Sequence, residues 1–379
     1  MAFKLPFQNL IGFNEKVYIQ RIRICDKCGF IFTENPLTQE QLSIRYKEYS
    51  KYEFDDENHI LQESEEYQAR SYRQKQLIER NCNDIESIFE VGAASGFNLG
   101  LYKGIKRYGV EPSAVNCKLA KKYYSVEMFN GVFEEYINMP QNEKYDMVFL
   151  SHTLEHIVDP YAFIRQCSRI NNKYVFIEVP TIDYKNIKAP FDLFCDEHVN
   201  YFSLQGLTSL MNKAGYSIVD CNMVFEPKQT LPAGLPAIST IWEKKDSISV
   251  YQYPMIQTKD LLKAYIKLNK AAFGPVNRII DIIPSDERLA IWGAGNHASI
   301  LLANTNLKNK NIVKIYDSDV KKQRVFKMCG LPISAYKEDD VINGSVEGIL
   351  IATYSGQKAI TKILEKSGAN CKIYVLYNI

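Results

Sequence analysis

Long hydrophobic runs are missing from this chain of 379 residues. The longest apolar strings, such as residues 348–352, have the length of a β-strand and fall far short of the ~18 residues of a transmembrane helix. The N-terminal residues also lack the apolar core and the small-residue cleavage site of a secretory signal. We therefore expect a cytoplasmic protein that does not use a membrane.

An excess of charge of one sign is missing too. Lys and Arg number 46 against 44 Asp and Glu, which leaves a formal net charge of +2. Because sequence-independent binding to nucleic acid depends on a basic surface, this balance gives no reason to expect a nucleic-acid partner. Hydrophobic residues make up 46% and charged residues 24%, as in ordinary globular domains, which argues against a disordered chain.

The cysteines do not form the pattern of a disulfide framework. They number nine, an odd count, and are scattered from Cys25 to Cys371 in a long chain. Disulfide scaffolds are short and rich in paired cysteines. We therefore expect reduced thiols.

The order of apolar and polar segments predicts three domains, in line with ~150 residues per domain. Residues 1–81 form a mixed module with polar segments typical of helices. Short apolar strands alternate with helices over 82–245, where 216–225 and 237–242 suit a closing antiparallel pair, and this pattern starts again within 246–379. Such alternation is typical of parallel sheets covered on both faces, so we predict an α/β chain with two Rossmann-like units.

A glycine-rich turn opens the first of these units. Glu90 stands near the end of a predicted strand, and Gly92-Ala-Ala94-Ser-Gly96 follows it. Glycine lets the backbone turn sharply and approach a ligand closely. Glu111 ends the next strand, about twenty residues on, where a carboxylate can accept hydrogen bonds from ribose hydroxyls. Because Ala94 replaces a middle glycine, a dinucleotide fits poorly, and a strand–helix turn without a ligand remains the alternative.

Two later segments complete an ordered succession. Gly131-Val132-Phe133 follows a third strand, and His152-Thr-Leu-Glu155-His156 follows a fourth. The succession over about 85–245 resembles class I S-adenosylmethionine-dependent methyltransferases. The resemblance implies S-adenosylmethionine as cofactor, with its methionine end at the glycine turn, its ribose at the acid of the second strand and its adenine at the third turn. The implied cofactor contacts are Glu90, Gly92, Ala94, Gly96, Glu111, Pro112, Val132, Phe133 and His152.

The segment from His152 to His156 also matches the inverted zinc-protease pattern, in which two histidines and a glutamate lie on one helix face. It directly follows a buried strand within the methyltransferase succession, and a dedicated third ligand is not evident. We therefore prefer the methyltransferase interpretation and keep zinc-dependent hydrolysis as an alternative.

Glu197-His198 precedes the aromatic step Tyr201-Phe202. An adjacent carboxylate can orient an imidazole as a proton acceptor, since the pKa of histidine lies near working pH. The alternative is a capping or packing role, because Ser203 is suited to start a helix over 204–214.

The whole chain resembles the three-domain sugar C-methyltransferases, through Cys25-x-x-Cys28, the methyltransferase core, Glu197-His198 and a C-terminal glycine turn. Those enzymes methylate a keto sugar linked to a nucleotide diphosphate and carry an N-terminal zinc module. The resemblance implies a class I core between a small N-terminal module and a C-terminal Rossmann-like domain. It makes His198 the base, beside Glu197, and we place His156 and Tyr201 at the substrate.

Two departures from that family concern metal and mechanism. Its zinc module uses two cysteine pairs, so a zinc ion on Cys25 and Cys28 would need further ligands. The family has tyrosine and histidine where this chain has Cys195 and Asp196. A missing tyrosine hydroxyl weakens the stabilisation of a developing enolate.

A second glycine pattern, Gly293-Ala-Gly295-Asn296, opens the last unit, and Asp317 ends the next strand. In the resembled family this lobe helps to hold the sugar nucleotide, so we expect Gly293, Gly295 and Asn296 to contact phosphate or sugar. A structural turn and a nicotinamide dinucleotide site are the alternatives.

We therefore expect methyl transfer from S-adenosylmethionine to a nucleotide-linked keto sugar, at carbon, with His198 as base. O- or N-methylation of a sugar is the enzymatic alternative. A non-catalytic protein that binds S-adenosylmethionine or a sugar nucleotide is an alternative from another class. The sugar, its nucleotide and the oligomeric state do not follow from the sequence.

Overall fold

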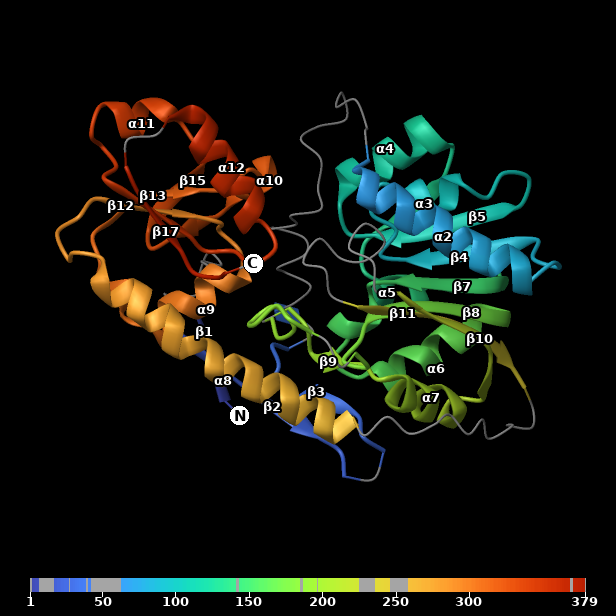
Figure 1. Cartoon of the computed structure of the whole chain (residues 1–379). Coiled ribbons are helices and arrows are strands. Elements are labelled where there is room, and N and C mark those ends of the chain that lie inside the picture. Colours follow the sequence, from blue (N-terminus) through green and yellow to red (C-terminus); the bar gives the residue numbers. More distant parts are fainter. Residues whose placement is uncertain are drawn as a thin grey trace. The chain divides into compact units, whose positions relative to one another are not determined.

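The chain divides into two compact units (Figure 1). The central unit consists of Arg23–Lys185 and Glu197–Leu261, and the terminal unit of Met1–Ile22, Asn186–Asp196 and Leu262–Ile379. The three predicted domain boundaries stay a prediction. This computed structural model describes residues 2–6, 17–26, 28–38, 40–41, 63–140, 143–184, 187–195, 197–224, 236–245, 258–368 and 371–378. None of the helices in these ranges has the length and apolar character that a membrane crossing requires.

A seven-stranded sheet in the order β10-β11-β8-β7-β4-β5-β6 forms the centre of the central unit. Five neighbouring strands of this sheet run parallel, and β11 runs antiparallel to both β8 and β10. The predicted parallel sheet and its closing antiparallel pair are thereby confirmed. The strands are β4 (Ser87–Val91), β5 (Lys106–Glu111), β6 (Glu127–Asn130), β7 (Tyr145–Ser151), β8 (Asn171–Pro180), β10 (Tyr216–Val224) and β11 (Ala237–Lys244).

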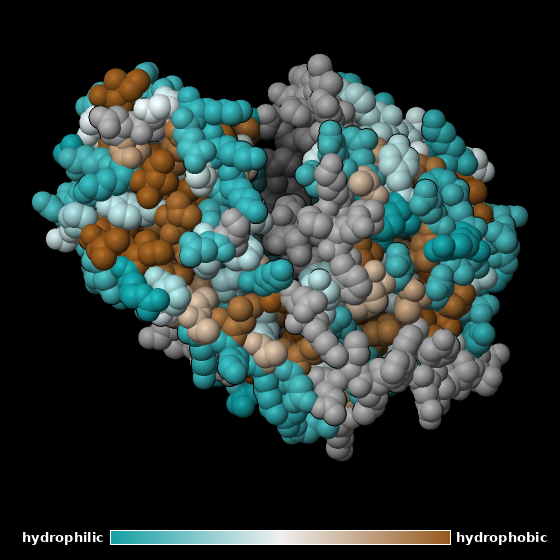
Figure 2. All heavy atoms as spheres, viewed as in Figure 1, coloured by the Kyte–Doolittle hydropathy of each residue, from teal (hydrophilic) through white to brown (hydrophobic). Residues whose placement is uncertain are grey.

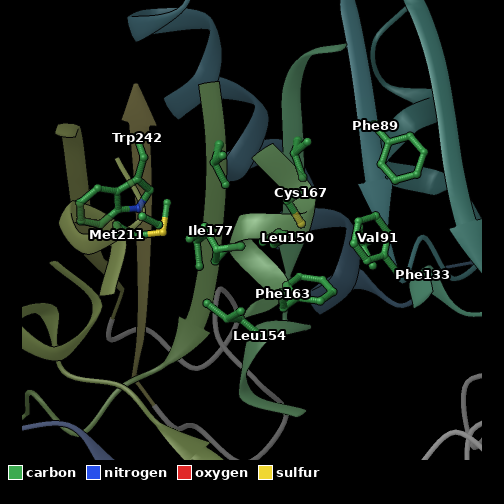
Figure 3. Packing of buried hydrophobic residues seen from close by; sticks show 14 of the residues in the cluster. Phe89, Val91, Phe133, Leu150, Leu154, Phe163, Cys167, Ile177, Met211 and Trp242 are labelled. Carbon is green, nitrogen blue, oxygen red and sulfur yellow. The ribbon is translucent and has the colours of Figure 1, made fainter. Parts of the chain in front are cut away.

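Helices cover both faces of this sheet (Figure 1). Neighbouring strand residues point to opposite faces, so Ile88 joins one buried cluster and Phe89 the other. The cluster around Phe89 includes Leu150, Phe163 and Trp242, as Figure 3 shows. On the Ile88 face lie α2 (Glu65–Asn81), α3 (Phe97–Gly100) and α4 (Ala114–Tyr124); on the Phe89 face lie α5 (Phe133–Ile137), α6 (Pro160–Ile170) and α7 (Leu204–Lys213).

Local sequence signals set where these helices begin. Asp159 caps α6 by accepting a hydrogen bond from the Ala162 N–H at 2.9 Å, and Pro160 occupies the first turn. Ser203 caps α7 through a 3.0 Å hydrogen bond from the Gly206 N–H. The predicted helix start at Ser203 is confirmed.

The terminal unit contains a second α/β sheet, in the order β14-β15-β13-β12-β16-β17. Its strands run parallel except for β14, which is antiparallel to β15. A second α/β unit is therefore confirmed. Its strands are β12 (Leu289–Trp292), β13 (Ile312–Tyr316), β14 (Lys327–Met328), β15 (Leu331–Ser334), β16 (Gly348–Ile351) and β17 (Lys372–Val375), and its helices include α8 (Thr258–Ile282), α9 (Asn296–Asn304), α10 (Val320–Val325), α11 (Glu338–Ile342) and α12 (Gln357–Ser367).

Residues 187–195, from the middle of the sequence, are built into this terminal unit. The Phe191 side chain is buried in its core although the φ angle of this residue is +69°. The Phe191 N–H donates to Asn269 Oδ1 at 2.7 Å, and Asn296 Nδ2 donates to the carbonyls of Phe191 and Phe194 at 3.1 and 2.8 Å. These bonds satisfy the backbone of a loop that the predicted boundaries had included in the 82–245 domain.

A smaller four-stranded sheet, in the order β1-β2-β3-β9, is separate from the two large sheets. β1 (Ala2–Pro6) pairs antiparallel with β2 (Val17–Ile24), and β3 (Ile31–Thr33) pairs antiparallel with β9 (Asn200–Tyr201). β9 begins two residues after His198.

The face seen in Figure 2 carries mainly hydrophilic side chains, with apolar residues in separate patches. Ile282 and Ile342 are among the exposed apolar residues. The large aromatic side chains, in contrast, are gathered in the buried clusters of both units.

Candidate active site

The turn after β4 requires left-handed backbone conformations. Gly92 and Gly96 have φ angles of +72° and +77°, and Ala94 has a φ angle of +47°. A Cβ atom at Gly96 would lie 2.7 Å from both Ala120 Cβ and Met128 Cε, so only glycine fits there. The glycine-rich motif is therefore explained by the backbone of this turn.

Glu111 is held against that turn. Its Oε2 atom accepts a hydrogen bond from the Ala94 N–H at 2.9 Å, and its Oε1 atom accepts one from the Ser113 N–H at 3.0 Å. The first bond compensates for the strained conformation of Ala94. The structure thus brings together the turn and the acid that the sequence placed on successive strands.

Glu90 lies buried beneath the same turn. Its Oε1 atom accepts a 2.8 Å hydrogen bond from Asn98 Nδ2, while its Oε2 atom has no hydrogen-bond partner among the described residues. Burial raises the pKa of Glu90 to about 8, against the lowering effect of the Asn98 bond. In its ionised form this carboxylate is suited to a ligand that brings a positively charged donor, which would in turn favour that form.

The remaining residues of the predicted cofactor site differ in what they can offer. The Gly131 N–H donates to the Glu111 carbonyl at 3.1 Å, which places the third turn next to the second. The Val132 N–H is bonded to Glu135 Oε2 at 3.1 Å, and the Phe133 ring is buried in the core. The half-buried Pro112 follows Glu111 directly. The contact of Phe133 with a cofactor stays a prediction.

The segment after β7 lies at the same edge of the sheet as the glycine turn. The carboxyl ends of parallel strands meet at one edge, and ligands bind there in α/β folds. Thr153 Oγ1 donates to the Val91 carbonyl at 2.9 Å, and a Cβ atom at Gly92 would lie 3.2 Å from Thr153 Oγ1. His152 to His156 therefore stand beside the predicted cofactor site.

His152 is enclosed by two carboxylates. Its Nε2 atom lies 3.3 Å from Glu178 Oε1, and its Nδ1 atom lies 3.3 Å from Glu155 Oε1. Burial and Arg70 act to lower the pKa of His152, but the two carboxylates outweigh them, so that its pKa is raised. Its role as a cofactor contact stays a prediction.

Glu178, which contacts His152, also belongs to a buried ion pair that was not predicted from the sequence. Arg73 of α2 donates to Glu178 Oε2 at 2.6 Å and to Ser239 Oγ at 2.7 Å. Burial opposes the charge on Glu178, yet His152 and Arg73 hold its pKa at about 2. Glu178 could have been noticed in the sequence because, like Glu111, it is an acid near the end of a buried strand. Its partners Arg73 and Ser239 could not have been found in this way, because they lie on distant segments.

Glu155, His156 and His198 come together although one of them is distant in sequence. Glu155 Oε1 lies 3.9 Å from His156 Nε2, and the rings of His156 and His198 meet edge to face with their centroids 4.9 Å apart. His156 Nδ1 lies 3.1 Å from the Glu197 carbonyl oxygen. Burial opposes the charge on Glu155, but His152 and the other two histidines lower its pKa to about 2.

Tyr201 supports the backbone at His198. Its buried hydroxyl donates to the His198 carbonyl at 3.0 Å, and Thr33 Oγ1 donates to the same oxygen at 3.4 Å. The predicted contact of Tyr201 with substrate stays a prediction, since the observed bond is internal. Asp196, one of the two departures from the sugar C-methyltransferases, lies outside the described residues.

Residues 61–220 match the family described as "Methyltransferase domain". The matched residues include the glycine turn and Glu111. They also include the group formed by Glu155, His156 and His198. This part of the chain is a methyltransferase domain. Its cofactor is S-adenosylmethionine, and its enzymatic class is that of the S-adenosylmethionine-dependent methyltransferases.

Solved methyltransferase structures are similar to the chain at low sequence identity. A possible histamine N-methyltransferase from Thermotoga maritima is 21% identical, with a TM-score of 0.36, over 48% of this chain and 92% of that one. Magnesium protoporphyrin IX methyltransferase from Synechocystis is 11% identical, with a TM-score of 0.39, over 55% and 100% of the two chains. No curated protein matches the chain.

The described residues of the methyltransferase domain fit its cofactor. Arg70 Nε, like Glu90 Oε2, is buried without a hydrogen-bond partner among the described residues. One is a donor and the other an acceptor, so the carboxylate and ammonium of an amino-acid group would satisfy both. We expect the methionine end of S-adenosylmethionine at Arg70 and Glu90, and its ribose at Glu111.

Glu111→Ala is expected to weaken S-adenosylmethionine binding by ~10–150-fold, since hydrogen bonds to charged groups contribute ~1.5–3 kcal/mol each. The substitution removes the acceptor that holds the Ala94 N–H as well as the predicted ribose contact. Calorimetric titration measures the affinity. Glu127→Ala, in an exposed ion pair with Lys121, is the control and should bind as the wild type does. An unchanged affinity of Glu111→Ala would contradict the assignment.

Gly96→Ala is expected to lower the free energy of unfolding by ~1–3 kcal/mol more than Gly215→Ala, the usual cost of overpacking. Both glycines have positive φ angles, +77° and +91°, so both variants carry backbone strain. Only the Cβ at Gly96 meets other atoms, because nothing lies within 4 Å of the Cβ position at Gly215. Urea unfolding measures the difference, and equal losses would show that the close packing of the turn does not matter.

The predicted metal ligands Cys25 and Cys28 lie in a tight turn of the central unit. The Cys25 N–H donates to the Phe30 carbonyl at 2.8 Å, and the Gly29 N–H donates to the Cys25 carbonyl at 2.9 Å. Burial raises the pKa of the Cys28 thiol. In the part of the chain that the structure describes, no third His, Cys, Asp or Glu joins the two thiols in a ligand group. Zinc binding here stays a prediction.

The second glycine turn, in the terminal unit, has the same hydrogen bond between a backbone N–H and an acid as the first turn. The Ala294 N–H donates to Asp317 Oδ2 at 2.8 Å, as the Ala94 N–H does to Glu111. Gly293 has a φ angle of +112°, Gly295 precedes α9, and Asn296 uses its amide to hold residues 187–195. Contacts of these residues with phosphate or sugar stay a prediction.

Proposed function

We propose that the chain methylates a nucleotide-linked keto sugar at the carbon next to the ketone, with His198 as the base. The observation that carries the proposal is the position of His198. It lies against His156 and Glu155, which stand at the sheet edge that carries the glycine turn. Bound S-adenosylmethionine supplies an electrophilic methyl group on a sulfonium ion.

The surroundings of His198 suit proton abstraction. Its imidazole takes the proton next to the ketone, and the buried negative charge of Glu155 stabilises the imidazolium that forms. The carbonyl of His198 is fixed by Thr33 and Tyr201, so the ring starts from a defined backbone. A base held in position in this way removes part of the entropic cost of proton transfer.

His156 has a defined tautomer in this arrangement. A carbonyl oxygen only accepts hydrogen bonds, so the nitrogen that faces the Glu197 carbonyl, Nδ1, carries the proton. The Nε2 atom then presents a lone pair or, when protonated, a donor. In the proposed reaction His156 acts in its imidazolium form, with both nitrogens protonated, and donates from Nε2 to the oxygen of the sugar ketone.

O- or N-methylation is the second candidate, and one observation favours it. Cys195 stands where the sugar C-methyltransferases have a tyrosine, and the hydroxyl of Tyr201 is bound to the His198 carbonyl. Fewer hydroxyl groups are then left to donate hydrogen bonds to a developing enolate. Deprotonation of a sugar hydroxyl or amine forms no enolate and does not need such donors.

Methyl-labelled product identifies the reaction. The full chain is incubated with S-adenosylmethionine carrying a ¹³C methyl group and with nucleoside diphosphate keto sugars, and the product is examined by NMR. The proposal predicts a methyl group coupled to a ring carbon. A methyl group on oxygen or nitrogen supports the second candidate, and the absence of transfer to any sugar nucleotide contradicts the sugar assignment.

A further inference from the structure

We propose that Glu155, His156 and His198 form a binding site for a divalent transition-metal ion, with Zn²⁺ as the best-suited ion. One ligand atom from each of these residues lies within 4.8 Å of the others. Among the described residues no other group of three His, Cys, Asp or Glu side chains has this property. The inference goes beyond the proposed function, in which no metal takes part.

The donor atoms have the chemistry that such an ion prefers. Two imidazole nitrogens and one carboxylate oxygen form a borderline set typical of zinc and its neighbours in the first transition row. In a tetrahedral site with zinc–nitrogen bonds of ~2.0–2.1 Å, ligand atoms stand ~3.3 Å apart. Glu155 Oε1 and His156 Nε2 are 3.9 Å apart, and all three ligand atoms lie within 4.8 Å of one another, so the side chains must move closer together to bind an ion.

The lone pair that a metal needs is already oriented on His156. Its Nδ1–H group donates to the Glu197 carbonyl at 3.1 Å, which leaves Nε2 as the nitrogen that faces Glu155. A backbone carbonyl that receives the other N–H of a histidine ligand is the usual support for metal binding. The tautomer required for coordination is therefore the one that the backbone selects.

The segments that carry the three ligands are bonded to each other. The Val199 N–H donates to the Glu155 carbonyl at 2.8 Å, next to the contact between His156 and the Glu197 carbonyl. Thr33 holds the His198 carbonyl from β3. Both segments belong to the central unit, so the group is assembled within one compact body.

The second carboxylate oxygen of Glu155 is an independent sign that this residue can bind a cation. The residue is only 1% exposed, and its Oε2 atom has no hydrogen-bond partner among the described residues. A buried carboxylate oxygen without a partner is costly, and a coordinated metal ion removes that cost. His152 Nδ1 lies 3.3 Å from the other oxygen, Oε1, and therefore does not satisfy Oε2.

Metal binding and the proposed base role of His198 exclude one another at any moment, because both use the imidazole lone pair. Zn²⁺ at this site would inhibit proton abstraction, and a chelator would restore it. The test below measures binding without turnover, so a failure of the proposed function leaves the metal proposal standing, and the reverse also holds.

Cobalt absorption spectroscopy tests the site directly. The full chain with Cys25→Ser and Cys28→Ser, freed of metal with a chelator, is titrated with Co²⁺ alone and then with Zn²⁺. We expect one Co²⁺ per chain, with visible ligand-field bands of a nitrogen and oxygen site that Zn²⁺ abolishes. His156→Gln and His198→Gln should each weaken Co²⁺ binding by at least ~100-fold, since even supporting residues of metal sites change affinity by ~10–100-fold.

Controls separate metal binding from folding. Each variant is compared with the parent in thermal unfolding and in S-adenosylmethionine affinity, and His297→Gln, in the terminal unit, should bind Co²⁺ unchanged. If a histidine variant does not fold, the near-isosteric variant Glu155→Gln replaces it in the test and should likewise weaken Co²⁺ binding. Absence of the bands in the parent, or bands that persist in His156→Gln and His198→Gln, would overturn the proposal.

Discussion

Alanine in place of His198 should slow exchange of the proton next to the sugar ketone by ~10²–10⁴-fold, the usual contribution of a positioned general base. The measurement is incorporation of deuterium from deuterated water into the nucleotide-linked keto sugar, followed by NMR. A chelator is present throughout, so that a metal ion on His156 and Glu155 does not affect the comparison. Exchange separates proton abstraction from methyl transfer because it needs no turnover of S-adenosylmethionine.

Two observations show whether the loss belongs to the imidazole itself. Added imidazole should restore part of the exchange in His198→Ala, because truncation leaves room next to His156 for a free base. The affinity for S-adenosylmethionine should stay at the wild-type value, because His198 is not part of the glycine turn that is expected to bind this cofactor. Exchange at the native rate in His198→Ala would remove this residue from the mechanism.

Arg73→Met should lower the free energy of unfolding by ~3–5 kcal/mol, the usual cost of removing one partner from a buried ion pair. The Glu178 side chain is fully buried and the Arg73 side chain is 12% exposed. Methionine keeps much of the length of the arginine stem but leaves the Glu178 charge without its closest cation. Urea unfolding of the full chain, followed by circular dichroism, measures the loss.

Arg23→Met is the matched control for this prediction. Arg23 pairs with Glu34 at 2.9 Å, but the two side chains are 59% and 39% exposed. Exposed pairs contribute ~0–1 kcal/mol, so this variant should unfold nearly as the wild type does. Similar losses in both variants would mean that Glu178 is compensated by other groups, with His152 as the first candidate.

The two sheets and the first glycine turn were predictable because their signals are local. A strand buried on both faces needs a run of apolar residues such as 147–150, and a left-handed turn selects glycine at position 96. Glu111 could be paired with the turn because parallel strands end at one edge. Each of these inferences uses neighbours in the chain or the geometry of one repeating unit.

The sequence did not show which individual side chains of the predicted site are buried or bonded to the protein itself. Phe133 was predicted at the adenine; its ring is packed in the core, and its contact with the cofactor stays a prediction. Tyr201 was predicted at the substrate, and its hydroxyl holds the His198 carbonyl. A residue type shows what a side chain can do, whereas its neighbours decide which of these uses is taken.

The sequence by itself determined the α/β class, the order of the strands along the chain and the position of the first glycine turn, because these depend on periodicity and on backbone conformations that few residues adopt. The binding of S-adenosylmethionine at this turn stays a prediction. The tertiary structure alone decided that His198 meets His156 and Glu155, and that Arg73 neutralises Glu178 across 105 positions. Such contacts depend on how distant segments pack. The charges of these groups follow the same packing, because burial and partners, rather than residue type, set each pKa.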